Sequence, residues 1–482
     1  MASIMLGGAT RSGYLADVLL QLLSIPALLL AAWLWLDRFA VGASRRNPWS
    51  AELLLGLAMA ACGVIIVLAQ AVPLFGVYGW AGISAHLSAA GAAPQGLAAT
   101  GSSSIDPAMS LAAVAAVVPP LALFLLVSVL GGEQRLRLLG WFVVFGLVSL
   151  AVGVLQVLQG PDSPLRFFAI SNREEAVGFF ANRNHFAAQL YVTLLLGVAW
   201  LATRDEHLLS SRTPTSRKVL WLAGVFCVAL LLLAGIALAR SRAGILLALV
   251  ASAAVVAMSP TLMTALRGRE RRPRRVRGII FAIMAALLLL VGQLGADRFL
   301  SRFDAGLVDQ MRATLNTVTL QAVRDALPFG TGLGTFPSVY AVYEGSRDLR
   351  PEYVNRAHDD WLEFPLETGI AGMLLVALFL AWFALRVFHI WIRPAPGEGT
   401  RHLIVQQCAS LAVLLLMLHS VVDYPLRTAT MLAYLAACCA LMTPARRVSA
   451  AFTMGEPVRE SMRRAAHEGL APAGAPTVSV RP

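Results

Sequence analysis

Long runs of apolar residues without charge constrain the fold of this chain more than any other feature. Eleven segments are long enough to cross a hydrocarbon core of about 30 Å, and a twelfth candidate is the Gly- and Ala-rich stretch 75–100. Backbone polar groups inside a bilayer must be satisfied within the chain, which helices achieve. The predicted class is therefore an all-α, polytopic membrane protein of about 11–12 transmembrane helices. The eleven segments are 15–36, 52–74, 109–130, 137–158, 184–202, 219–239, 243–263, 278–295, 370–392, 403–420 and 427–446.

Composition supports the same class. The 482 residues are 58% hydrophobic and 14% charged, whereas soluble domains have about 25% charged residues. The net charge of +12 lies in stretches without interleaved aromatic residues or a nucleic-acid motif, so we expect no nucleic-acid partner. All five cysteines lie inside apolar runs without CxxC spacing, which predicts buried hydrophobic residues rather than disulfides or metal ligands. Segment 15–36 is too long for a signal-peptide core and is interpreted as a span.

The distribution of arginine assigns the two sides of the membrane. Arginines fall on alternate connections, with seven of them in 264–277, and cytoplasmic loops carry the excess of basic residues. We therefore expect a transmembrane bundle over 1–295, a large periplasmic loop over 296–369, further transmembrane helices over 370–446 and a disordered, basic cytoplasmic tail over 447–482.

The loop 296–369 is longer than most connections, which indicates a structured functional element. Met311, Leu315, Val318 and Ala322 form one apolar stripe, so a surface helix is predicted over 309–327. A Gly-rich turn over 328–334 ends it. The alternative is an amphipathic helix that lies on the membrane without a chemical role.

Polar clusters that are unexpected in so apolar a chain all map to the expected periplasmic face. They contain Arg183, Arg242, Arg312 and His358. Ionisable groups at membrane depth are costly and indicate function. Guanidinium groups bind phosphate oxygens in pairs of hydrogen bonds, and histidine accepts a proton near neutral pH. The pattern predicts diphosphate binding and hydroxyl activation, with no metal and no cofactor.

Each of these residues also has a structural interpretation. Arg242 could extend to the interface from the start of its helix, and Arg312 could be one charge on a solvated helix face. His358 could be a neighbour of a helix cap, with Asp359 and Asp360 in the first turn of that helix.

The remaining polar residues of this face are expected to support the site. Asn182 and Asn184 are good cap and turn residues, which favours a structural role for His185 at a helix start. His419 and Asp423 are four residues apart, a spacing that predicts a hydrogen-bonded pair shaping a turn.

The ordered set of motifs over residues 175–440 resembles the O-antigen ligase and polymerase superfamily of integral-membrane glycosyltransferases. The motifs are GFFANRNHFA at 178–187, SRAG at 241–244, Arg312 followed by PFGTGLGTF at 328–336, AHDDWLE at 357–363 with Glu367, Gly369 and Gly372, and HSVVDYPL at 419–426.

This resemblance implies a GT-C-like helical fold with a periplasmic loop above a lateral cavity. It implies that Arg242 and Arg312 are functional arginines and that His358 is the catalytic histidine. This chain differs from the family in two features: the number of spans, which is usually twelve, and the residue after His358. We count eleven, and Asp359 stands where Asn or Ser is more familiar, so that an acid next to His358 is expected to raise its basicity.

The resulting hypothesis is a glycosyltransferase of the bacterial inner membrane with its active site facing the periplasm. It would move a glycan from undecaprenyl diphosphate to a hydroxyl with inversion, with Arg183 as a third diphosphate contact. The acceptor could be another lipid-linked repeat, a lipid A core or, in a protein O-oligosaccharyltransferase, a protein hydroxyl. A lipid-linked glycan flippase or other transporter is the non-enzymatic alternative. Transporters often have internal repeats and polar residues near the bilayer midplane, and the sequence has neither.

Overall fold

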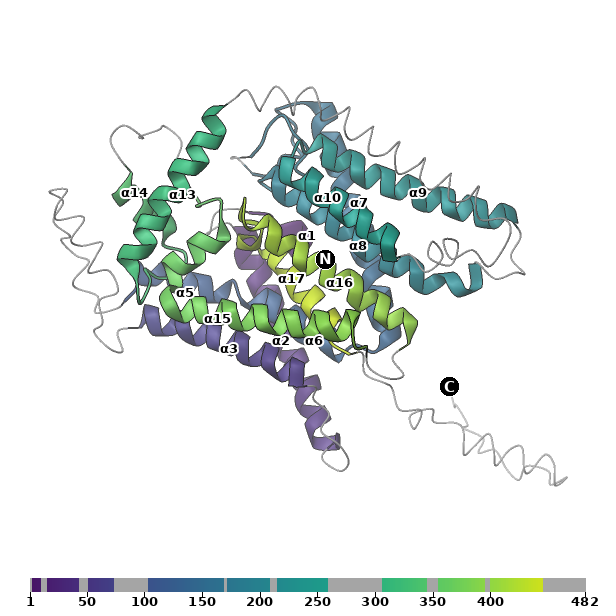
Figure 1. The fold of residues 1–482 in the computed structure, drawn as a ribbon, viewed down its shortest axis with the longest axis horizontal. Coiled ribbons are helices and arrows are strands. Elements are labelled where there is room, and N and C mark those ends of the chain that lie inside the picture. The colour runs from purple at the N-terminus through teal and green to yellow at the C-terminus, as the bar shows by residue number, and fades with distance from the viewer. Residues whose placement is uncertain are drawn as a thin grey trace, which may run out of the picture. The chain divides into compact units, whose positions relative to one another are not determined.

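A computed structural model of the chain describes residues 2–9, 15–42, 51–72, 103–168, 171–208, 215–258, 306–344, 354–394 and 399–444, and the elements in these ranges are all helices (Figure 1). The predicted all-α class is confirmed. In chain order the helices are α1 (Ala2–Leu6), α2 (Leu15–Gly42), α3 (Ala51–Ala71), α5 (Pro107–Ala115), α6 (Val118–Val129), α7 (Gly132–Gln159), α8 (Arg183–Leu208), α9 (Thr215–Leu238), α10 (Arg242–Met258), α13 (Gly306–Ala326), α14 (Phe336–Tyr343), α15 (Asp360–Trp391), α16 (Thr400–His419), the 3₁₀ turn η2 (Pro425–Arg427) and α17 (Ala429–Met442).

Within the described residues, seven stretches are long and apolar enough to cross a membrane. They are Leu15–Leu36, Leu53–Ala71, Pro107–Val129, Gly132–Gln159, Arg183–Leu201, Asp360–Trp391 and Arg401–His419. Three shorter apolar helices coincide with further predicted spans: Ala223–Leu238, Arg242–Val255 and Ala429–Met442. These findings confirm a polytopic membrane protein. The predicted span 278–295, the candidate 75–100, the arginine-rich loop 264–277 and the tail 447–482 lie outside the described residues.

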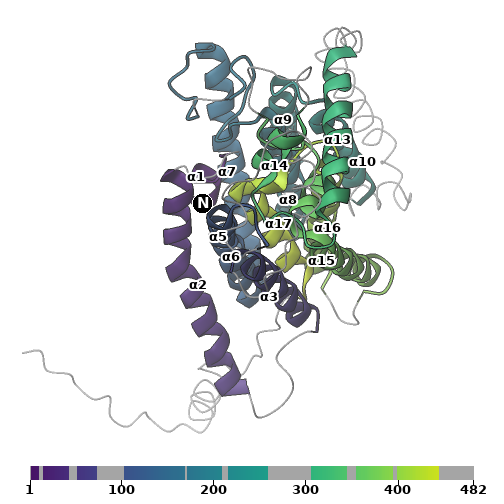
Figure 2. The same cartoon turned by 90° about the vertical axis from the view of Figure 1, so that its left-hand side faces the viewer.

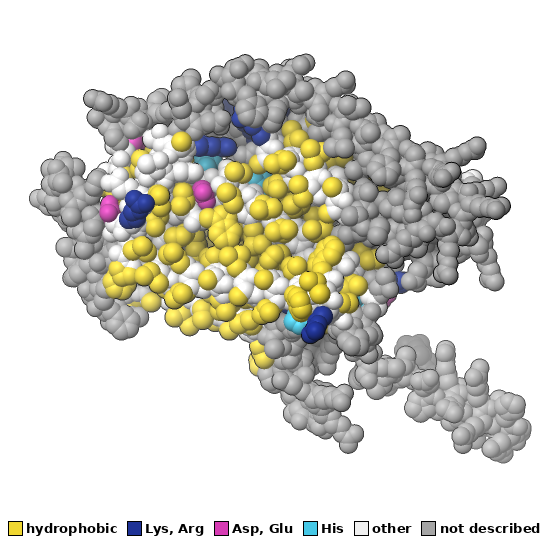
Figure 3. Space-filling model, viewed as in Figure 1, with side chains coloured by type: hydrophobic (Ala, Val, Ile, Leu, Met, Phe, Trp, Pro, Cys, Tyr) yellow, Lys and Arg dark blue, Asp and Glu magenta, His cyan; other side chains and the backbone are white. Residues whose placement is uncertain are grey.

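Helix α8 is the most enclosed of the long apolar helices. It packs against α7, α9, α10 and α16, and Phe186, Tyr191 and Leu195 on it are fully buried. Close approach to α7 depends on small residues, because a Cβ added at Gly146 would lie 2.5 Å from the Thr193 side chain. In contrast, α2, α3 and α15 carry exposed leucines and other large apolar side chains. Figure 3 shows such side chains covering most of the described face, as expected for contact with lipid.

The large loop contains the predicted helix, α13, followed by the short helix α14. Helix α13 ends at Ala326, and its stripe is turned inward: Leu315 and Ala322 are buried and pack with residues of α14. Both helices contact α15 (Figure 1). Leu315, Val318 and Ala322 of the predicted stripe therefore pack within the protein.

Helix α15 is interrupted at Gly369, whose φ of 62° is left-handed. The interruption leaves backbone groups that the Gly-rich turn satisfies: Thr331 N donates to Leu366 O at 3.0 Å and Gly332 N to Glu367 O at 2.9 Å. The Gly-rich turn and the interrupted part of α15 approach so closely that a Cβ on Gly330 would lie 2.5 Å from the backbone oxygen of Glu367. Glycine is required here for both conformation and space.

The first described residues pack against the first turn of α17. Thr430 N donates to Gly7 O at 3.0 Å and Ala181 N to Gly8 O at 3.1 Å. Figure 2 shows α1 at one end of α2, and α1 also contacts α17. Residues near the start of the chain are thereby hydrogen-bonded both to α17 and to Ala181, which directly precedes Asn182.

Candidate active site

His358 is the residue immediately before the cap of α15. Asp359 caps the helix, because its carboxylate accepts hydrogen bonds from Trp361 N at 2.9 Å and Leu362 N at 3.3 Å. His358 itself has a left-handed φ of 55°. This conformation turns the chain just before the helix begins, so that the imidazole ring reaches the segment that contains Asp423. His358 Nδ1 lies 3.0 Å from Asp423 Oδ1.

The acid that contacts the His358 ring is therefore Asp423. Asp359 is adjacent in sequence, but its carboxylate is used by the backbone of α15. An ionised carboxylate only accepts hydrogen bonds, so Nδ1 of His358 carries the proton in this contact. Nε2 is left as the nitrogen that can accept another. The His358 side chain is 33% exposed, whereas that of Asp423 is 1% exposed.

Asp423 lies at the centre of a polar cluster. Its Oδ2 accepts a hydrogen bond from Asn182 Nδ2 at 3.4 Å and lies 3.8 Å from His185 Nε2. Burial on its own would raise the pKa of the Asp423 carboxyl. The hydrogen bond from His358 and the charges of His185, His358 and His419 outweigh burial and hold the pKa well below its usual range. Asp423 is thus a buried, ionised carboxylate at neutral pH.

Asn182 and His185 bring the start of α8 into this cluster. Asn182 caps the helix as predicted, since its Oδ1 accepts a hydrogen bond from Asn184 N at 2.8 Å. His185 is fully buried, and the Tyr424 ring lies edge-on to it at 4.9 Å and to His358 at 4.8 Å. The role of His185 is therefore more than that of a residue at a helix start, because it shares both Asp423 and Tyr424 with His358.

His419 joins the cluster through its side chain and through its backbone. Its Nδ1 lies 3.1 Å from the hydroxyl of Tyr191, and its link to Asp423 is a backbone one, from Asp423 N to His419 O at 3.0 Å. The predicted hydrogen-bonded pair that shapes a turn is thus present, and its hydrogen bond is formed by the backbone. His419 is close enough to Asp423 and Arg312 to interact with both electrostatically.

The three candidate arginines differ in their surroundings. Arg312 is exposed on α13 and acts electrostatically on His419. Arg242 is the first residue of α10, whose start packs on α8: a Cβ on Gly244 would meet Ala187. Arg183 forms an ion pair with Glu175, so its charge is already matched within the protein.

The structure brings together a second group of charged residues near His358, to which the sequence analysis assigned no shared role. We call it the charge network: Arg356, Asp360, Glu363, Glu367 and Arg427. Arg427 contacts all three acids, with its Nη1 at 2.6 Å from Glu367 Oε2, and Arg356 Nη1 lies 2.8 Å from Glu363 Oε1. Burial alone would lower the pKa of Arg427, but the three carboxylates raise it above its usual value. The acids at 360, 363 and 367 recur at helical spacing, which is the signal that could have identified them.

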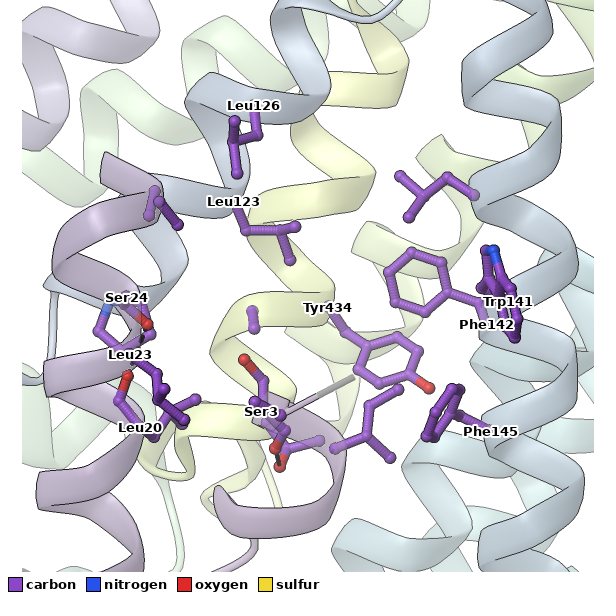
Figure 4. Close-up of a pocket in the computed structure, with 18 residues that line it drawn as sticks. Ser3, Leu20, Leu23, Ser24, Leu123, Leu126, Trp141, Phe142, Phe145 and Tyr434 are labelled. Atoms are coloured by element: carbon purple, nitrogen blue, oxygen red, sulfur yellow. Dashed lines mark hydrogen bonds between the residues drawn. The ribbon is translucent and has the colours of Figure 1, made fainter. Parts of the chain in front are cut away.

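A cavity of about 210 Å³ lies among α1, α2, α6, α7 and α17. Figure 4 shows Leu20 and Leu23 of α2 on one side and Trp141 and Phe142 of α7 on the other, with Tyr434 of α17 between them. The lining is mostly apolar and includes neither His358 nor Arg242. In the described part of the chain, no group of three or more His, Cys, Asp or Glu residues is arranged to hold a metal ion.

Comparison with protein-family models finds a match over the part of the chain that contains Arg242, Arg312 and His358. The matching model, described as O-antigen ligase, covers residues 227–377. This match confirms the resemblance to the O-antigen ligase and polymerase superfamily seen in the sequence, and it indicates a glycosyltransferase-type enzyme. Asp423 and Asn182 lie outside the matched residues. Comparisons with curated proteins and with solved structures find no significant match.

Proposed function

We propose that the protein transfers a glycan from undecaprenyl diphosphate to a hydroxyl acceptor, on the periplasmic side of the bacterial inner membrane, in surface-polysaccharide synthesis. The observation that carries this proposal is the 3.0 Å contact between His358 Nδ1 and Asp423 Oδ1 within an O-antigen ligase-type protein. It supplies the group that an acceptor hydroxyl needs to become a nucleophile.

His358 acts as the general base. Its Nδ1 donates to Asp423, which fixes the ring and favours the positive charge that forms when Nε2 takes the hydroxyl proton. The acceptor oxygen then forms the new bond to the anomeric carbon while the bond from that carbon to the diphosphate oxygen breaks. Attack opposite the leaving group inverts the anomeric centre.

Arg242 and Arg312 bind the diphosphate. Negative charge grows on the leaving phosphate in the transition state, and preorganised cations at such a position contribute on the order of 3 kcal/mol each. Arg312 is exposed and electrostatically coupled to His419, which supports a place near the reacting atoms. Arg183 is paired with Glu175, so we give it a weaker, secondary contact. The apolar cavity of Figure 4 offers hydrocarbon-compatible surface for a lipid chain.

The acceptor defines the subclass. A second lipid-linked repeat makes the protein a polymerase, a lipid A core makes it a ligase, and a protein hydroxyl makes it an O-oligosaccharyltransferase. We favour the polymerase and ligase class, because the matched family is described as O-antigen ligase. A lipid-linked glycan transporter is the alternative from a different class, and it would leave the glycan on its diphosphate.

The test uses the purified full chain in lipid nanodiscs with undecaprenyl-diphosphate-linked repeats. Ladders from repeats alone support a polymerase, and products that need lipid A core support a ligase. His358→Ala should lower the rate of either product by about 10²- to 10⁴-fold, whereas His389→Ala should not, since His389 is an exposed histidine at the other end of α15. Unchanged transfer by folded His358→Ala protein, or no consumption of the diphosphate by the wild type with any acceptor, would overturn the proposal.

A further inference from the structure

The structure points to Arg427 as a positioning residue for His358. Arg427 holds together the charge network, which fixes the backbone on both sides of His358 and anchors the Gly-rich turn of the large loop. This inference rests on the proposed role of His358 as the general base, and assigns Arg427 no contact with substrate.

Arg427 is the only member of the charge network that contacts every acid in it. Its Nε lies 3.2 Å from Asp360 Oδ1 and 3.5 Å from Glu363 Oε1, and its Nη1 lies 2.6 Å from Glu367 Oε2. The Arg427 side chain is only 12% exposed, and those of Glu363 and Glu367 are completely buried. Without Arg427, three neighbouring carboxylates would share one remaining cation, Arg356, and would repel one another.

The charge network contacts the chain immediately before His358. Glu363 accepts hydrogen bonds from Ala357 N and from Arg356 Nη1, each at 2.8 Å. Ala357 is fully buried. Because the left-handed φ of His358 costs free energy for a residue with a Cβ, its surroundings must hold it in place. The bond from Ala357 N to Glu363 is one such restraint.

The charge network also contacts the chain immediately after His358. Asp360 N donates to Ser420 O at 2.9 Å, and the Asp360 carboxylate accepts from Ser420 Oγ at 2.8 Å while it is paired with Arg427. Ser420 and Arg427 belong to the same short segment as Asp423. The segment 420–427, in which Asp423 contacts the His358 ring, is thereby hydrogen-bonded to the backbone that follows His358.

A third connection reaches the large loop. Glu367 Oε1 accepts hydrogen bonds from Gly334 N at 3.0 Å and Phe336 N at 3.2 Å, while Glu367 Oε2 binds Arg427. These amides lie in the Gly-rich turn that links α13, which carries Arg312, to α14. One arginine therefore joins the position of the base to that of the loop proposed to bind the diphosphate.

The test compares Arg427→Lys with Arg324→Lys, a control at an exposed arginine in the last turn of α13. Lysine keeps the charge but cannot present a guanidinium fork to three carboxylates. Misplacement of a reacting group by about 1 Å can cost about 100-fold, so we expect kcat for transfer to fall about 10- to 100-fold in Arg427→Lys. The KM for the lipid-linked donor should stay unchanged, and the control should match the wild type.

A double mutant separates positioning from a general loss of structure. In a His358→Ala background the base is gone, so Arg427→Lys should cause no further loss of the residual rate. A purely structural role would lower the rate by the same factor in both backgrounds. Glu367→Gln is the second variant if Arg427→Lys does not fold: glutamine still accepts from the loop amides but loses the ion pair, and it should also lower kcat with KM unchanged.

The outcomes distinguish this inference from the proposed function. If His358→Ala strongly lowers the rate of transfer but folded Arg427→Lys and Glu367→Gln proteins both keep the wild-type kcat, the positioning role is overturned and the base remains. Equal, additive losses in both backgrounds overturn it as well. If His358→Ala keeps the wild-type rate, the proposed function itself fails.

Discussion

The Nδ1 atom of His358 lies 3.0 Å from Oδ1 of Asp423, a residue 65 positions further along the chain. The contact joins the start of α15 to the turn between α16 and η2. It gives a partly exposed imidazole a buried, ionised partner, and the chemistry proposed for the protein depends on that pair.

Replacement of Asp423 by Asn tests the pair directly. Asparagine has the same shape but no charge, so it stabilises neither the required tautomer nor the imidazolium that forms during proton transfer. General-base catalysis is worth about 10²- to 10⁴-fold, and we expect kcat to fall by about that factor with little change in KM. Initial rates with saturating acceptor measure it. Asp162→Asn is the matched control, because the Asp162 side chain is 94% exposed; a wild-type rate in Asp423→Asn would contradict the assignment.

The same residue predicts how stability depends on pH. The pKa of Asp423 is held below its usual range in the folded protein, compared with about 3.9 in an unfolded chain. A carboxyl whose pKa is lowered on folding stabilises the folded state, and this contribution is complete when the pH is above the pKa of the unfolded chain. The contribution is lost as the pH falls toward the pKa of the folded state. The difference in thermal stability between wild type and Asp423→Asn should therefore persist from about pH 8 to about pH 5 and shrink only below about pH 4. A difference that closes between pH 8 and pH 5 would show that the carboxylate is not held ionised.

Much of this arrangement could be predicted from the sequence, because local patterns carry it. Apolar runs predict the spans that the described helices confirm, helical periodicity predicts α13, and the unusual polar residues give His358, Arg242 and Arg312 as candidates for the site. The partners could not be predicted in the same way. Asp359 was the acid nearest to His358 in sequence, but the fold selects Asp423.

Long-range contacts explain the other omissions. Arg427 meets Glu367 across 60 residues, and Thr430 meets Ser3 across 427, so neither contact leaves a periodic signal. The interruption of α15 at Gly369 coincides with the predicted start of the span 370–392, but only the packing of the Gly-rich turn shows why the helix breaks there.

The arginines are expected to differ in their effect on transfer. Arg242→Ala and Arg312→Ala should each lower kcat on the order of 100-fold, as for the loss of one donor that stabilises a developing charge. Arg183→Ala should have a smaller effect on kcat, because the Arg183 guanidinium is paired with Glu175. Rates with the lipid-linked donor, measured on variants of equal thermal stability, test this order. A larger loss at Arg183 than at Arg312 would reverse the assignment of the diphosphate contacts.

Asp359 is expected to matter for stability and little for chemistry. Its carboxylate caps α15, and removal of a cap costs about 0.5–2 kcal/mol. Asp359→Ala should therefore lower thermal stability, whereas Asp359→Ser, which keeps a capping oxygen, should restore it with a near wild-type kcat. If Asp359→Ser loses activity as severely as Asp423→Asn, the acid at 359 has a direct effect on His358, and a capping role alone does not describe it.

Gly369 and Gly330 should tolerate no side chain, since the Gly-rich turn packs against the broken helix backbone to backbone. A Cβ on Gly369 would lie 2.3 Å from the oxygen of Pro328 and would occupy a left-handed φ of 62°. The conformation alone costs about 1–3 kcal/mol, and the clash must also displace the turn that binds Glu367. Gly369→Ala should lower both thermal stability and kcat. Gly224→Ala is the matched control, because a Cβ there meets nothing within 4 Å and alanine favours a helix by about 0.5–1 kcal/mol over glycine. Equal stability of the two variants would show that the turn does not dock on α15 as described.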